Sequence, residues 1–280
     1  MSAADALTAL HHLVATTTSM TSATPSIEPG TLALLVGAAL LAGWVDAVVG
    51  GGGLVQLPAL VLGLPGASPV RLLATNKLAS ICGTTTSAIT YLRRVRPDLR
   101  TAIPLALAAF GGSASGAFFA RFISKEAFTP IILVALVLVG AYTLFTPSLG
   151  QATVLRFSGR KHLGTALLIG ALVGFYDGIL GPGTGSFFVF ALVGLCGYAF
   201  IEASAKAKIA NMATNLAALV VFIPQGAVLW HIGLLMGAAN VLGGYLGART
   251  AVARGHGFVR AVFVIVVGAF IIRLTYDLLT

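Results

Sequence analysis

The chain has 280 residues, of which 58% are hydrophobic and 9% charged, with a mean hydropathy of +0.98 and a formal net charge of +9. Because a soluble domain carries about a quarter charged residues, this composition excludes a soluble protein and indicates an integral membrane protein. The arginines lie in short loops between apolar segments, where positive charge sets orientation. The expected partner is therefore a lipid bilayer and not nucleic acid.

The chain opens with a non-basic tail, residues 1–30, that contains Asp5 and Glu28 but no Lys or Arg. Two sets of apolar segments follow, separated by a basic linker at 147–162, and the longer ones have the length of a membrane-spanning helix. The segments lie near 31–49, 54–64, 70–92, 101–120 and 129–146, then near 163–180, 186–198, 203–223, 228–248 and 258–278. Both sets have the order long, short, long, long, long. We therefore expect an all-α integral membrane protein built of two homologous repeats of transmembrane helices, 31–146 and 163–280.

Residue identities support this duplication. When position n is set against n + 131, Asp46 falls on Asp177 and Lys77 falls on Lys208. Each repeat then contains a helix with an aspartate, a Gly-rich break, a short apolar segment and a helix with an early lysine. The pattern leaves open whether the short segments are re-entrant or cross the membrane fully.

Loop charge predicts how the repeats are oriented. The loop at 93–100 holds four arginines, whereas its counterpart at 224–231 carries no formal charge. Since basic loops face the cytoplasm, the two repeats are predicted to be inverted relative to each other. Inverted repeats are typical of secondary transporters, whose site lies near the bilayer midplane at broken helices.

The Gly-rich breaks, GGGG at 50–53 and GPGTGS at 181–186, interrupt the backbone where lipid is expected. Such a break is tolerated only if it is packed in protein or lines a cavity. Glycines leave amide N–H groups uncovered, and a helix that starts after them points its positive end at the gap, which suits an anion. The predicted binding residues of the breaks are Gly50, Gly51, Gly52, Gly53, Gly181, Gly183, Thr184, Gly185 and Ser186. The chain has no G-x-x-x-x-G-K-[ST] string for ATP.

Lys77 and Lys208 are predicted to lie about 10 Å along their helices, where an isolated charge costs about 2.5 to 3.5 kcal/mol. A single lysine there is expected to snorkel to the interface, but the matched pair favours a shared cationic site for an anion. Polar side chains at helical spacing on the same helices are added to this site: Asn76, Thr84, Asn211 and Asn215. Contact between helices is an equally good interpretation for Asn211 and Asn215.

Asp46 and Asp177 have three interpretations: each neutralises a lysine, caps the broken backbone, or accepts a coupling proton. A coupling or structural role is favoured over substrate contact, because a carboxylate repels an anion. The two cysteines, Cys82 and Cys196, lie in apolar segments and cannot form a metal cluster. We expect no metal site, no cofactor and no catalytic residue.

The segments GWVDAVVGGGGLVQLPAL, ATNK at 74–77 and GFYDGILGPGTGSFF resemble the signature segments of the TauE/SafE sulfite exporter family of bacterial and archaeal membrane permeases. The resemblance covers about 31–278. It implies transport of sulfite, organosulfonates or related sulfur-containing anions across the cytoplasmic (inner) membrane, without ATP hydrolysis. The second repeat has AKAK at 205–208 where the first has ATNK, so Lys206 is a cation without a counterpart.

The sequence therefore predicts a multi-pass secondary transporter of a small sulfur-containing anion, with proton coupling as an option and the substrate held between the two breaks. The alternative within transport is another small solute, such as a carboxylate or a metal ion. From a different class, an intramembrane enzyme or a membrane scaffold remains, although no Ser/His/Asp or H-E-x-x-H arrangement supports the enzyme. The anion, the direction, the coupling ion and the oligomeric state stay open, with a homo-oligomer among the alternatives.

Overall fold

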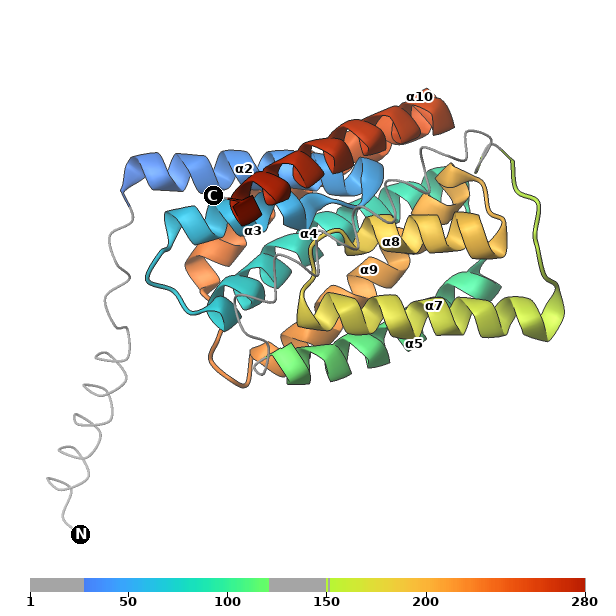
Figure 1. Cartoon of the computed structure of the whole chain (residues 1–280), viewed down its shortest axis with the longest axis horizontal. Coiled ribbons are helices and arrows are strands. Elements are labelled where there is room, and N and C mark those ends of the chain that lie inside the picture. The colour runs from blue at the N-terminus through green and yellow to red at the C-terminus, as the bar shows by residue number, and fades with distance from the viewer. Residues whose placement is uncertain (1–27, 121–149, 151, 280) are drawn as a thin grey trace, which may run out of the picture. The chain divides into compact units, whose positions relative to one another are not determined.

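The computed structural model describes residues 28–120, 150 and 152–279 (Figure 1). The chain divides into two compact units, Met1–Ala33 and Leu34–Thr280. The described part of the first unit is the start of a helix, in which the amide of Leu32 donates to the carbonyl of Glu28. Every interaction analysed below lies in the second unit. Helix is the only regular secondary structure of the described residues, in agreement with the predicted all-α class.

The helices of the first half begin and end within three residues of the predicted segments. They are α2 (Pro29–Val49), α3 (Gly52–Gly63), α4 (Pro69–Val95) and α5 (Leu99–Phe119). The fifth predicted segment, 129–146, lies outside the described residues. Pro69 is the first residue of α4, where its missing N–H leaves no hydrogen bond unmade.

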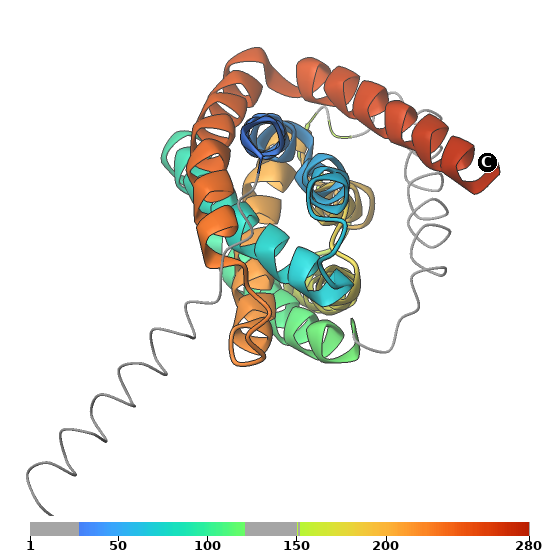
Figure 2. The same cartoon turned by 90° about the vertical axis from the view of Figure 1, so that its left-hand side faces the viewer.

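The second half consists of α7 (Gly159–Ile179), α8 (Thr184–Ala191), the π-helical turn η2 (Leu192–Cys196), α9 (Phe200–Phe222) and α10 (Trp230–Leu279). The last two predicted segments are joined in α10, which bends at Gly255, a residue with φ 73° and ψ −166° (Figure 2). The stretch between them is rich in Ala and Arg and contains no proline. Because these are strong helix formers, the chain continues as helix up to the glycine and resumes after it.

Three of the described helices are long and apolar enough to cross a membrane: α2, α5 and α7. The two helices that carry the predicted site lysines, α4 and α9, are more polar and have many buried residues. This is the expected arrangement of a membrane protein in which polar helix faces turn toward protein.

Glycines bring neighbouring helices into backbone contact at matching positions. α5 and α7 lie side by side (Figure 1), and a Cβ added to Gly112 would overlap the carbonyl of Ala171 and lie 2.9 Å from the amide nitrogen of Phe175. At the position 131 residues later, a Cβ on Gly243 of α10 would overlap the carbonyl of Leu40 in α2 and lie 2.9 Å from the amide nitrogen of Trp44. These contacts need residues without a side chain.

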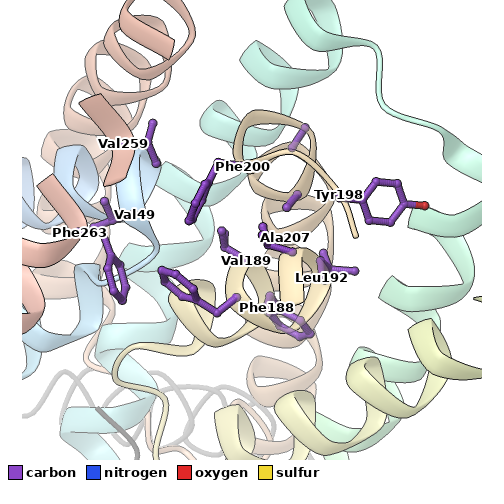
Figure 3. Packing of buried hydrophobic residues seen from close by; sticks show 14 of the residues in the cluster. Val49, Phe188, Val189, Leu192, Tyr198, Phe200, Ala207, Val259 and Phe263 are labelled. Atoms are coloured by element: carbon purple, nitrogen blue, oxygen red, sulfur yellow. The ribbon is translucent and has the colours of Figure 1, made fainter. Parts of the chain in front are cut away.

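An aromatic core fixes the short helix α8. Phe188 and Phe200 are fully enclosed (Figure 3), and the ring of Phe190 packs 5.5 Å from Phe200 and 4.0 Å from Phe263, measured between ring centroids. The same cluster includes Val49 at the end of α2. The core therefore holds the ends of both broken helices in one place.

The Gly112 contact predicts opposite effects for two adjacent glycines of α5. Gly112→Ala should lower the free energy of unfolding by about 1 to 3 kcal/mol, because the new methyl group overlaps the α7 backbone. Gly111→Ala is the control: nothing lies within 4 Å of its added Cβ, so it should be neutral or stabilise the helix by about 0.5 to 1 kcal/mol. Thermal unfolding of both purified variants in detergent measures the difference, and equal melting temperatures would contradict the close contact.

Candidate functional site

Both helix breaks contain glycines in the left-handed backbone region. Gly50, between α2 and α3, has φ 84°, and Gly181 and Gly183, between α7 and α8, have φ 86° and 80°. Residues with a Cβ rarely adopt these angles, so the breaks depend on glycine. Pro182 lies in the turn, two residues before the first residue of α8.

The two breaks contact each other through their backbones. The amide of Ser186 donates to the carbonyl of Gly50 at 3.2 Å, and the Ser186 hydroxyl donates to the carbonyl of Val49 at 2.6 Å. A Cβ added to Gly185 would lie only 2.5 Å from the Cα of Gly50. Carbonyl groups at the open end of α2 are thus paired by α8, which satisfies backbone groups that lipid cannot.

Lys77 of α4 pairs with Asp177 of α7. The distance from Lys77 Nζ to Asp177 Oδ2 is 2.6 Å, and both side chains are buried. The hydroxyl of Ser113 on α5 lies 3.4 Å from the same carboxylate oxygen and 2.8 Å from the carbonyl of Thr214, to which it donates. The lysine charge is therefore neutralised within the protein and does not snorkel.

Lys208 of α9 makes the corresponding pair with Asp46 of α2. Its Nζ lies 3.0 Å from Asp46 Oδ2 and also donates to the backbone carbonyl of Asp46. Of the three interpretations of the aspartates, the structure shows lysine neutralisation, and in each case the partner comes from the other half of the chain. Asp46 and Asp177 lie near the C-terminal ends of α2 and α7.

A small polar cavity lies at this junction. Its volume is about 20 Å³, room for about one water molecule. The lining residues are Asp46, Gly50, Gly53, Asn76, Lys77, Ser80, Asp177, Gly181, Thr184, Gly185, Asn211 and Asn215. All of them except Ser80 were singled out from the sequence.

The other predicted site residues lie beside the cavity lining: Gly51, Gly52, Thr84, Gly183, Ser186 and Lys208. Thr84 receives a hydrogen bond from Asn215 at 3.4 Å and donates to the carbonyl of Ser80 in its own helix. Gly52 packs on α2, since a Cβ there would lie 2.6 Å from the carbonyl oxygen of Ala42. The hydroxyls of Thr184 and Ser186 both donate to backbone carbonyls in this conformation, so neither is free to donate to an anion.

Two buried amides support the site and were missed in the sequence. Asn240 of α10 donates to Gln56 Oε1 at 2.6 Å, and Gln56 of α3 donates to the backbone carbonyl of Asn76 at 3.2 Å. This chain links three helices behind the cavity, while Asn76 Oδ1 is buried without a hydrogen-bond partner. The sequence contained a signal for both residues, because a Gln or Asn in an apolar membrane segment must find its hydrogen-bond partner within the protein.

Lys206 belongs to a separate polar cluster. Its Nζ lies 2.7 Å from Glu202 Oε1 and 3.9 Å from the centroid of the Tyr198 ring, and the Tyr198 hydroxyl lies 2.8 Å from His162 Nε2. Burial opposes ionisation of nearby Asp98, but hydrogen bonds from Thr101 and Arg100 and the charge of Lys206 outweigh it and lower the pKa of Asp98. Lys206 is therefore neutralised outside the cavity.

Apolar helices that enclose buried ion pairs and a polar cavity define a membrane protein of the transporter type, and similar proteins carry that description. The chain is 37% identical to a probable membrane transporter protein, ORF9, of Sinorhizobium over 88% of this chain and 93% of the relative. It is 36% identical to the probable membrane transporter protein YfcA of Escherichia coli over 90% of this chain and 92% of the relative. It is 35% identical to a probable membrane transporter protein of Haemophilus influenzae over 88% and 95% of the two chains.

The chain belongs to the sulfite exporter TauE/SafE family, which it matches over residues 35–274. The family that the signature segments resemble is thus confirmed. No solved structure matches the chain.

The buried pair Lys77–Asp177 predicts a non-additive effect on stability. Asp177→Leu alone should lower the free energy of unfolding by about 3 to 5 kcal/mol, because the Lys77 charge is left buried and unpaired. The double variant Lys77→Met with Asp177→Leu removes both charges and should recover most of that loss. Unfolding of the purified variants in detergent micelles measures the coupling. Additive losses in the double variant would show that the two charges do not stabilise each other.

Proposed function

We propose that the protein is a secondary transporter of a small sulfur-containing anion, such as sulfite, a sulfonate or a related organosulfur anion, in the cytoplasmic membrane. The observation that carries the proposal is the buried polar cavity between the two glycine breaks, with a lysine from each half of the chain beside it. The family description supports the substrate class.

The anion is attracted by two sources of positive charge at one break. Thr184 and Gly185, in the first turn of α8, line the cavity, so the positive end of that helix faces it. Lys77 lies at the same place: a Cβ added to Gly181 would be 3.2 Å from Lys77 Nζ. An ammonium group and amide N–H groups together bind oxyanions through charge-assisted hydrogen bonds.

The site is closed and electrically balanced in this conformation. Two lysines face two aspartates, and the cavity holds about 20 Å³, which is too small for an oxyanion. Binding therefore requires the helices to separate and one carboxylate to lose its charge or move away. Protonation of an aspartate meets the second requirement, which is why we include proton coupling in the proposal.

The proposed architecture is a duplication with inverted halves, 31–146 and 163–280, in which the Gly-rich breaks and short helices form the substrate site at the midplane. The ion pairs support it, because exchanging the two repeats turns one pair into the other. Lys77 becomes Lys208, 131 positions later, and Asp177 becomes Asp46, 131 positions earlier. Thr84 and Asn215, which are 131 residues apart, contact each other. Self-contact of equivalent positions is the expected property of residues on a two-fold axis between repeats.

Transport by reconstituted protein tests the function. Proteoliposomes should take up labelled sulfite or methanesulfonate, and Lys77→Met should weaken anion binding roughly ten- to a hundredfold, because a charge-assisted partner worth about 1.5 to 3 kcal/mol is lost. The control is Lys161→Met, which removes an exposed lysine at the start of α7 and should leave binding unchanged. Uptake of acetate in preference to both sulfur anions would reject the substrate class and favour a carboxylate carrier.

The orientation of the halves is tested by labelling. In a background without Cys82 and Cys196, the single variants Arg96→Cys and Gln225→Cys should react with an impermeant thiol reagent from opposite sides of the membrane. Reaction of both from the same side would contradict the inverted arrangement and leave the transport proposal standing.

A further inference from the structure

We propose that the two aspartates divide their roles: Asp46 takes up and releases the coupling proton, whereas Asp177 remains ionised and holds Lys77 in place. This inference rests on the proposed anion transport. It arises from differences between two ion pairs that the sequence presents as equivalent.

Asp177 is held by a short ion pair and is shielded from water. Its Oδ2 lies 2.6 Å from Lys77 Nζ and 3.4 Å from the Ser113 hydroxyl, and 2% of its side chain is exposed. The ammonium stabilises the ionised carboxylate because it directs a hydrogen at it, whereas the Ser113 hydroxyl gives its one hydrogen to the carbonyl of Thr214. Protonating Asp177 would forfeit the ion pair with Lys77.

Asp46 is held less firmly and is more accessible. Lys208 Nζ lies 3.0 Å from its Oδ2, and 13% of its side chain is exposed, at the wall of the cavity. The sequence explains the difference: Ser113 corresponds to residue 244 when the offset of 131 is added, and that residue is Gly244. A glycine has no side chain, so the hydroxyl that lies beside the Asp177 carboxylate has no equivalent beside Asp46.

Lys208 stays in place when Asp46 is neutral, because it also donates to the backbone carbonyl of Asp46 at the end of α2. The C-terminal end of a helix attracts a cation, so this second contact keeps the ammonium at the site. Lys77 donates to the side chain of Asp177, and among the described residues no contact with the backbone carbonyl of Asp177 accompanies this hydrogen bond. Protonation of Asp46 therefore leaves the charge of Lys208 unbalanced while the lysine stays in place. Protonation of Asp177 would instead remove the contact that holds Lys77.

The charges that face Asp46 determine what protonation does. α9 brings Lys208, α4 brings Lys77 and α7 brings Asp177, while α3 and α8 line the cavity with uncharged residues. The Tyr91 hydroxyl of α4 donates to the carbonyl of Ala47 next to Asp46, and α10 meets α2 at the uncharged Asn240. The four charges sum to zero with Asp46 ionised and to +1 with Asp46 protonated, which is the charge that one monoanion balances.

The transport step is then a balanced exchange. One proton from water on the first side binds Asp46, one monoanion enters beside Lys208 and Lys77, and both leave to water on the second side. No bond of the anion forms or breaks, and no net charge crosses the membrane. A pH difference of one unit can therefore maintain about a tenfold concentration ratio of the anion.

Proton uptake on binding tests the assignment directly. Purified protein in weakly buffered detergent solution is titrated with methanesulfonate, which stays ionised and cannot itself take up the proton. Wild-type protein should take up about one proton per anion bound, Asp46→Asn should bind the anion with no proton uptake, and Asp46→Glu should restore the uptake. Proton uptake that persists in Asp46→Asn would overturn the assignment. Anion binding by wild-type protein without proton uptake would overturn it as well.

Proteoliposomes separate this inference from the function on which it rests. With an acidic exterior by one pH unit, wild-type protein should accumulate methanesulfonate or sulfite about tenfold. Asp46→Asn should still exchange labelled anion at equal concentrations but should not accumulate it, and the control Asp98→Asn, which neutralises an exposed carboxylate before α5, should still accumulate it. Exchange without accumulation in folded Asp177→Asn, with accumulation intact in Asp46→Asn, would reverse the roles. Wild-type protein that exchanges neither anion would reject the proposed function itself.

Discussion

Four charged side chains must be neutralised deep inside an apolar protein, and the arrangement of its helices follows from that requirement. An uncompensated charge at the centre of a membrane helix costs several kcal/mol, so Lys77 and Lys208 each need a carboxylate within hydrogen-bond distance. The carboxylates lie on α7 and α2, so each ion pair joins a lysine-bearing helix to the aspartate-bearing helix of the other half. The halves are therefore held together by ion pairs as well as by packing.

These pairs also define what the site can do. Two lysines and two aspartates balance each other's charge at the cavity, so any ion that enters it alters that balance. In the proposed function, the helix N-terminus of α8 and Lys77 attract the anion, while the aspartates keep the empty site neutral. In that proposal, the same groups stabilise the empty site and select the substrate of the loaded one.

Much of the fold was predictable because lipid leaves few alternatives for the backbone. Segment length gave the described helices to within three residues at most ends, and the repeated glycines marked where α2 and α7 stop. Ion pairing was foreseen as one option, but the partners were not, because an offset of 131 leaves Lys77 equally able to pair with Asp46 or Asp177. Ser113 was missed for another reason. It lies in the small-residue stretch GGSASG, whose pattern indicates helix packing, and only the packing of α5 against α7 brings its hydroxyl to a carboxylate.

The backbone contact between Gly50 and Gly185 has a consequence for how this chain can evolve. In the duplication proposed above, each half would otherwise be free to change independently of the other. Here the tightest point of one half is built from the other: the carbonyls of Val49 and Gly50 are paired by Ser186, and neither glycine leaves space for a methyl group on its partner. A larger residue at one break would therefore collide with the backbone of the other break. The two breaks therefore have to change together, because room for a side chain at one of them exists only if the backbone of the other moves.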